Sequence, residues 1–93
     1  MSSTEDFDAR LGRKMATWRE SKGVSQDSLA EQLKRDQSFV SKLERGQRRI
    51  TVFELMCWAT ELDISLEVVI REVDSAWSEG SLGKSIWERE RDD

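Results

Sequence analysis

Apolar residues recur every three or four positions along most of this chain, and no proline interrupts the pattern. That spacing places apolar side chains on one face of an α-helix, whereas a half-buried strand would alternate with a period of two. No segment alternates convincingly. The chain is therefore predicted to be all-α, and its 93 residues suit one small, compact domain with a single core.

Three helices are predicted in the first half of the chain, each with a residue that can begin or end it. The first covers residues 7–22 and stops at Gly23. Ser25 can cap the second, and Asp36 can cap the third, which ends at Gly46. The inward-facing residues expected in these helices are Phe7, Leu11, Met15, Trp18, Leu29, Ala30, Leu33, Phe39, Val40 and Leu43. Only a few residues join the second helix to the third.

Two further helices are predicted in the second half. Thr51 and Glu54 match the two ends of a capping box at the start of the fourth helix, which runs through Leu62, and Ser65 can cap the fifth. The apolar faces expected for these helices consist of Val52, Leu55, Met56, Ala59, Leu62, Leu66, Val69, Ile70 and Val73.

The expected organisation is a flexible N-terminus over residues 1–6, a helical domain over 7–73 and a C-terminal tail over 74–93. The tail is predicted because glycines and serines interrupt the apolar pattern there. It nevertheless contains Trp77 and Trp87, whose apolar area suits packing on the same domain, contact across a dimer or binding of another protein. We predict that at least one of the two is buried and that the tail serves as a dimerisation arm.

Charge is distributed unevenly along the chain, although the formal net charge is only -4. Residues 9–49 carry eleven Lys and Arg against five Asp and Glu, while residues 50–93 carry four against eleven. Five of the cationic side chains fall within residues 35–50. The third predicted helix and the loop after it thus form a basic stretch in an acidic protein, which is compatible with nucleic-acid binding if those cations share one face.

Several functional classes are disfavoured by composition. There is no histidine and no glycine-rich phosphate loop, and the single cysteine, Cys57, cannot form an internal disulfide or a metal site on its own, so we expect no catalysis, metal or cofactor. No membrane span or secretory signal is recognisable, which favours the cytoplasm. Cys57 lies with Phe53 off the main stripe of its helix, which leaves a core position and a subunit interface both open.

Two short helices joined by a tight turn, over about residues 25–45, describe a helix-turn-helix, whose second helix can enter a DNA major groove. Val40 and Leu43 anchor that second helix. On its opposite side lie Gln37, Ser38, Ser41 and Lys42. Residue types alone would also allow an ordinary solvated helix face.

The runs Gly-Val-Ser-Gln-Asp-Ser-Leu-Ala at 23–30 and Phe-Val-Ser-Lys-Leu-Glu-Arg-Gly at 39–46 resemble the Cro and phage-repressor type of helix-turn-helix domain. The resemblance covers about residues 10–71. It implies a lambda-repressor-like fold of five helices and a regulator of transcription that binds double-stranded DNA, usually as a homodimer on an inverted repeat. It also implies that Gln37, Ser38, Ser41 and Lys42 read bases.

Other roles are implied by the same resemblance. Ser25 and Gln26 match phosphate contacts at the start of the second helix, and the matching contacts from the loop after the third helix are Arg45, Gln47, Arg48 and Arg49. Arg19 and Glu44 match a structural ion pair. One departure is Lys34, which stands where the family often has glycine, so that a left-handed backbone there would be strained.

A second function remains open at this stage. The chain could keep the helix-turn-helix fold and mainly bind another protein, as an antitoxin-like or regulatory partner, through its tail. The residues considered for contact with a second subunit or another protein are Phe53, Cys57, Trp77 and Trp87. A continuous positive face around the third helix favours DNA, whereas glutamates reaching into that face favour the protein partner.

Overall fold

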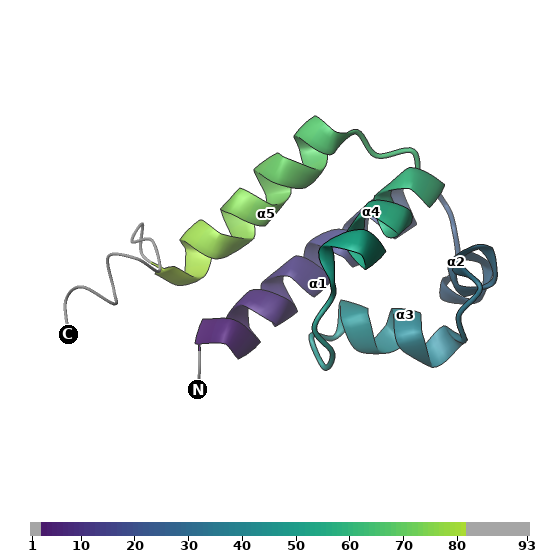
Figure 1. The fold of residues 1–93 in the computed structure, drawn as a ribbon, viewed down its shortest axis with the longest axis horizontal. Helices are drawn as coiled ribbons and strands as arrows, with labels where there is room; N and C mark the ends of the chain where they lie inside the picture. Colours follow the sequence, from purple (N-terminus) through teal and green to yellow (C-terminus); the bar gives the residue numbers. More distant parts are fainter. Residues whose placement is uncertain (1–2, 82–93) are drawn as a thin grey trace.

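The computed structural model describes residues 3–81, which form five helices and no strand (Figure 1). The helices are α1 (Ser3–Ser21), α2 (Gln26–Leu33), α3 (Gln37–Glu44), α4 (Val52–Glu61) and α5 (Leu66–Ser81). The predicted all-α fold of five helices is confirmed. None of these helices is both long enough and apolar enough to span a bilayer, as far as residues 3–81 are concerned.

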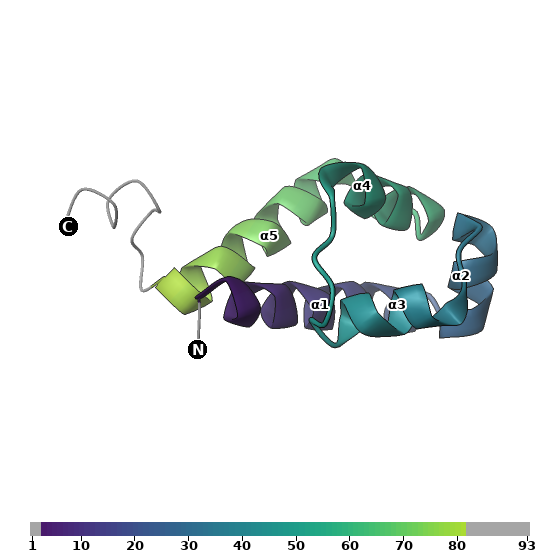
Figure 2. The same ribbon diagram turned by 60° about the horizontal axis from the view of Figure 1, so that its bottom comes forward.

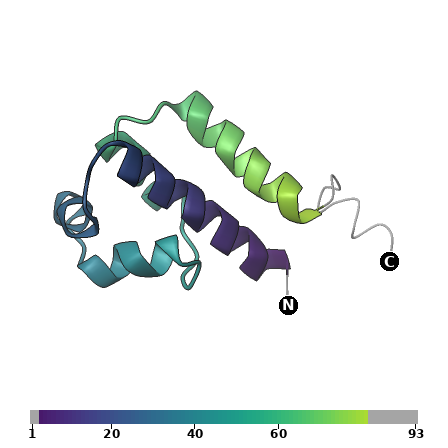
Figure 3. The ribbon, with the colours of Figure 1, turned by 180° about the vertical axis from the view of Figure 1, so that it is seen from behind.

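Helix α1 is the centre of the fold. Seen from behind, it lies between α3 and α5 (Figure 3). In the turned view, α4 and α5 form an upper layer over α1 and α3, and α2 closes one end while contacting α3 and α4 (Figure 2). The core between these layers is formed mainly by Leu11, Met15, Trp18, Leu29, Val40, Leu43, Trp58, Ala59, Leu62 and Val69. Trp58 is fully buried, and its indole N–H donates to the Met15 carbonyl oxygen over 3.3 Å.

The predicted helix starts are set by local hydrogen bonds. The Ser25 hydroxyl accepts from the Ser28 amide at the start of α2, and the Asp36 carboxylate accepts from the Phe39 amide at the start of α3. The capping box of α4 has both of its reciprocal bonds, from Thr51 and Glu54. These caps satisfy amides that a helix start leaves without a partner, which is why the first residues of these short helices can be predicted from the sequence.

Two predicted helix boundaries were wrong. Helix α1 begins at Ser3 rather than residue 7, and α5 continues through Ser81 rather than ending near residue 73. The two helices run side by side, and the added turns of α5 pack on α1 (Figure 1). The Phe7 and Trp77 rings meet edge to face with centroids 5.9 Å apart. Packing of this kind outweighs the low helix propensity of Gly and Ser.

The apolar faces predicted for α4 and α5 are only partly covered by the fold. Val52, Leu66 and Ile70 are 78%, 54% and 60% exposed. They lie where α4 and α5 face outward, and no described element covers them. Helical periodicity identifies an apolar face but does not tell whether the fold supplies a neighbour for all of it.

Candidate nucleic-acid interface

The turn between α2 and α3 sets the direction of the third helix. Lys34 adopts the left-handed conformation, with φ 59° and ψ 40°. This is the backbone conformation for which the family often has glycine at this position. Its amide donates to the carbonyl oxygens of Ala30 and Glu31, and the Arg35 amide donates to Ala30. The chain thus tolerates a lysine where the turn geometry favours glycine, because these bonds close the end of α2.

Helix α3 separates an apolar face from a polar one. Phe39, Val40 and Leu43 are buried, and Val40 has no exposed area. On the other side, Gln37, Ser38 and Lys42 are exposed and Ser41 is half-buried. The four candidate base-reading residues therefore lie on the outward half of α3, as its spacing predicts; whether they read bases stays a prediction.

The start of α3 carries a further hydrogen bond. The Ser38 hydroxyl donates to the Asp36 carboxylate over 2.8 Å. This bond, followed by the one from the Phe39 amide, lowers the pKa of Asp36 below its ordinary value. Ser38 is thus engaged at the helix start in the free protein, whereas no hydrogen bond within residues 3–81 holds the Ser41 hydroxyl or the Lys42 amine.

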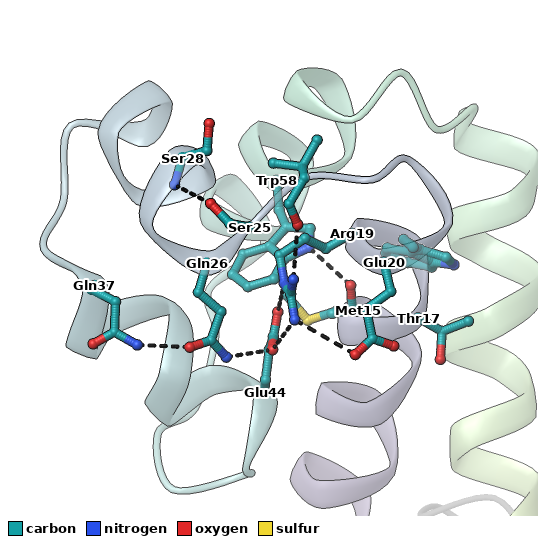
Figure 4. Close-up of polar contacts among 12 residues, drawn as sticks. Met15, Thr17, Arg19, Glu20, Ser25, Gln26, Ser28, Gln37, Glu44 and Trp58 are labelled. Carbon is teal, nitrogen blue, oxygen red and sulfur yellow. Dashed lines mark hydrogen bonds and ion pairs between the residues drawn. The ribbon is translucent and has the colours of Figure 1, made fainter.

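A chain of four polar side chains connects the buried side of α3 to its exposed side (Figure 4). Arg19 of α1 donates to both carboxylate oxygens of Glu44, over 2.6 and 3.0 Å. The Gln26 amide nitrogen donates to Glu44 over 2.8 Å, and Gln37 donates to the Gln26 oxygen over 2.7 Å. Gln37 is exposed, yet this network fixes which way its amide points, leaving its carbonyl oxygen and one N–H for another partner.

The ion pair in that network is the one implied by the resemblance. The Glu44 and Arg19 side chains are 6% and 11% exposed, and Arg19 also donates to the Val24 carbonyl oxygen over 2.8 Å. The hydrogen bonds that Arg19 donates to Glu44 raise the pKa of Arg19. Because the pair is nearly enclosed and joins α1 to α3, it has little area to offer to solvent or a ligand; that it fixes α3 on α1 stays a prediction.

The candidate phosphate contacts fall into three groups. Ser25 and Gln26 lie at the start of α2, where backbone N–H groups point outward. Arg45 and Gln47 are exposed, and Arg45 has no ion pair within residues 3–81. Arg48 and Arg49, by contrast, already have carboxylate partners. Arg49 lies 3.5 Å from Asp8 and keeps 73% of its side chain exposed.

Arg48 is held by a residue whose second role the sequence did not predict. Its guanidinium donates to both oxygens of Glu54, over 2.8 and 3.0 Å, and that carboxylate also lies 3.4 Å from Arg35. The capping-box pattern identified Glu54, but nothing in the local sequence indicated that the α2–α3 turn and the loop after α3 would both approach it.

The residues considered for a second subunit or another protein do not lie together. Phe53 is 76% exposed and, with the half-buried Cys57, lines a small cleft beside Leu33 and Phe39. Trp77 is half-buried on α5, next to Phe7. Trp87 lies outside the described residues. No group of three His, Cys, Asp or Glu side chains that could hold a metal ion occurs in the part of the chain that the structure describes.

Comparison with known proteins identifies this arrangement. The family model described as "Helix-turn-helix domain" matches residues 10–69. The restriction-modification controller protein C.AhdI from Aeromonas hydrophila is 35% identical, with 70% of this chain and 92% of that chain covered and a TM-score of 0.60. Two structures of the clp gene regulator ClgR from Corynebacterium glutamicum are 27% and 25% identical, with TM-scores of 0.69 and 0.71.

The first ClgR structure covers 76% of this chain and 91% of its own, and the second covers 82% and 81%. No curated protein matches the sequence. The resemblance to the Cro and phage-repressor type is thereby confirmed. The chain belongs to the helix-turn-helix domain family.

Proposed function

We propose that this protein is a sequence-specific DNA-binding regulator of transcription, which acts as a homodimer on an inverted-repeat operator and represses from there. The observation that carries the proposal is the outward face of α3, where Gln37 is oriented by Gln26 and Glu44. An oriented amide can make a bidentate pair with the N6 and N7 edge of adenine, worth about 1–3 kcal/mol of discrimination. The controller and regulator proteins of similar structure agree with this role.

The remaining side chains of this face divide between reading and gripping. Lys42 can donate to guanine O6 and N7, and Ser38 and Ser41 can contact either base edges or the sugar-phosphate backbone. Ser25, Gln26, Arg45, Gln47 and Arg49 border the face and suit phosphates, which hold the domain in register without reading sequence. Arg48 can join them only with the part of its guanidinium that Glu54 does not use.

The acidic net charge does not oppose DNA binding at this face. The two glutamates that reach toward it, Glu44 and Glu54, have side chains only 6% and 14% exposed, and each is paired with arginine. Glu54 is paired with two arginines, Arg35 and Arg48, so the three side chains together carry a net positive charge. This favours DNA over the antitoxin-like or other protein-binding alternative, for which free glutamates on this face would have been the sign.

Selection from a random DNA pool tests the proposal. The intact protein should enrich one sequence, and Gln37→Ala should relax preference at one or two base positions while costing about 1–3 kcal/mol on the best site. Gln32→Ala is a matched control, because Gln32 is also exposed but lies in the last turn of α2 and not on α3. Enrichment of no sequence would overturn the proposal and favour the protein-binding alternative.

The dimer is supported by an open apolar groove between α4 and α5. The groove has a volume of about 660 Å³ and is lined by Val52, Leu55, Met56, Leu66, Val69, Ile70, Val73, Asp74 and Trp77. Among the described residues that line the groove, Asp74 is the only charged one, so an apolar occupant fits. Monomeric proteins rarely expose large contiguous apolar patches, and a second copy of this chain brings an equal patch of its own.

The charges beside the groove suit a second copy. Glu67 and Arg71 are exposed on α5, one turn apart, and neither has an ion pair within residues 3–81. If two α5 helices pack antiparallel about an axis near residues 68–69, Leu66 meets the partner's Ile70 and Glu67 meets the partner's Arg71. The same patch then serves both subunits, as twofold symmetry requires.

Sedimentation equilibrium tests this surface. Leu66→Gln with Ile70→Gln should convert the dimer to a folded monomer and weaken binding to a two-half-site operator far more than to one half-site. Phe53→Gln is the control, because Phe53 is as exposed as Val52 but faces the cleft on the other side of α4. An unchanged dimer in the groove variant would contradict the assignment. A monomeric Phe53→Gln protein would contradict it too and would place the interface at Phe53 and Cys57.

A further inference from the structure

Glu54 connects three segments that are separate in sequence. Its carboxylate accepts from the Thr51 amide over 3.0 Å as part of the capping box of α4. It also accepts two hydrogen bonds from Arg48 and lies 3.4 Å from a nitrogen of Arg35. The Glu54 side chain is 14% exposed, while those of Arg48 and Arg35 are 35% and 42% exposed.

The two arginines share a second partner. The Arg35 guanidinium carbon lies 3.8 Å from the centroid of the Phe39 ring, and that of Arg48 lies 4.9 Å from it. Phe39 is itself 6% exposed and belongs to the apolar face of α3. A cation over an aromatic face is attracted by the ring's negative quadrupole, and the attraction strengthens as water is excluded.

The positions of the arginines along the chain give this cluster its meaning. Arg35 immediately precedes Asp36, the residue that caps the start of α3. Arg48 follows the end of α3 and also donates to the Arg49 carbonyl oxygen over 2.9 Å. Both ends of the helix that carries the candidate base-reading residues are therefore tied to one carboxylate on α4.

We propose that Glu54 is a positioning residue for DNA recognition, which holds Arg35 and Arg48 against Phe39 and so fixes both ends of α3 for insertion into the groove. The proposal rests on the proposed function. It gives Arg48 a different main task from the phosphate contact that the resemblance implies: Arg48 braces the loop after α3. The loop's exposed Arg45 and Gln47 then meet phosphates from a fixed place.

The carboxylate stays charged wherever the protein would work. The hydrogen bonds from Arg48, followed by the one from the Thr51 amide, lower the pKa of Glu54 from 4.5 to about 2. The stability that the ionised form contributes is thus complete above about pH 4.5 and is lost as the pH falls toward 2. The brace is constant over the neutral range and does not act as a pH switch.

Two variants separate the brace from the helix cap. Glu54→Gln keeps a side chain that capping boxes accept but removes the charge and one acceptor oxygen. Thr51→Ala removes the cap hydroxyl and leaves the Glu54 carboxylate with its arginines. Both should lower the unfolding midpoint. Only Glu54→Gln should reduce the ratio of affinities for the selected site and for random DNA, by about tenfold, with Arg48→Ala reducing it similarly and the two changes together adding little.

A measurement without DNA supports the same distinction. Amide hydrogen exchange in the free protein should accelerate at both ends of α3 in Glu54→Gln, and only in the first turn of α4 in Thr51→Ala. The proposed function is tested beforehand by whether the intact protein selects a sequence at all, so its failure is recognised separately from failure of the brace.

Three results would overturn the proposal. If Glu54→Gln binds specific and random DNA more tightly, Glu54 competes with phosphates for the arginines instead of positioning α3. If Arg48→Ala weakens both kinds of DNA equally and reduces the salt dependence by one phosphate contact, Arg48 mainly grips the backbone. If exchange at the ends of α3 is unchanged in Glu54→Gln, the contacts do not hold the helix.

Discussion

The helix-turn-helix part and the α4–α5 part of this domain are completed in different ways. Around α3, exposed and buried polar side chains are tied to each other and to α1 and α4, so α3 is positioned within one chain. Between α4 and α5 an apolar groove stays open. The comparison indicates that the helix-turn-helix half is preorganised within one chain, whereas the α4–α5 half has an apolar groove that, as we propose, a second copy covers.

The largest effect in the first half is expected from its enclosed ion pair. Glu44→Ala should lower the free energy of unfolding by about 3–5 kcal/mol, because it strands the Arg19 charge in a nearly buried place. Arg19→Ala should add much less than its own cost when combined with it. Urea unfolding of the two single variants and the double variant measures this.

A matched control is available on the same arginine. Glu20 lies 3.8 Å from Arg19 but is 68% exposed, so Glu20→Ala should cost less than about 1 kcal/mol. Equal costs for Glu44→Ala and Glu20→Ala, or additive costs in the cycle, would mean that the network of Figure 4 does not position α3.

A smaller effect is expected where α1 and α3 touch. A Cβ on Gly12 would overlap the Leu43 carbonyl oxygen and lie 2.7 Å from the Glu44 carbonyl oxygen. Gly12→Ala should therefore destabilise the protein by about 1–3 kcal/mol, despite the better helix propensity of alanine, because α3 must move away from α1. The midpoint of thermal unfolding and the affinity for the selected DNA should both fall.

Gly23 provides the contrast for that change. It has φ 69° but nothing within 4 Å of an added Cβ, so Gly23→Ala should cost only the backbone strain of about 1 kcal/mol and leave DNA binding intact. A Gly12→Ala protein more stable than the original would show that α1 and α3 are less closely packed than the structure has them.

The first half was also the more predictable from sequence. Caps such as Ser25 and Asp36 are local, because the acceptor and the amide it satisfies lie three residues apart. The outward placement of Gln37 and Lys42 follows from helical spacing once Val40 is assigned to the core. The Arg19–Glu44 pair was implied by the family resemblance and not by any local pattern.

What the sequence did not predict depends on contacts between distant segments. The exposure of Leu66 and Ile70 reflects the absence of a covering neighbour within the described chain, which periodicity cannot reveal. The extra turns of α5 pack on α1, where Trp77 meets Phe7. Glu54 was recognised as part of a capping box. Its partners Arg35 and Arg48 precede it by 19 and 6 positions in the sequence and meet it only in the folded domain.

The smallest effect compares the turns of the two halves. Each contains one non-glycine residue in the left-handed region, Lys34 with φ 59° between α2 and α3 and Asp63 with φ 56° between α4 and α5. Aspartate adopts this conformation more readily than lysine, because its short polar side chain can hydrogen-bond locally. Lys34→Gly should therefore raise the free energy of unfolding by up to about 1 kcal/mol, after the greater chain entropy of the unfolded state is included. Asp63→Gly should change it by only a few tenths of a kcal/mol.

Lys34→Ala serves as the control for the lost charge and should give no gain in the free energy of unfolding, since alanine keeps the backbone strain. Chemical unfolding of the three variants decides the matter: a gain in Lys34→Ala as large as in Lys34→Gly would place the cost in the lysine side chain, and a larger gain at Asp63 would place the greater strain in the α4–α5 half.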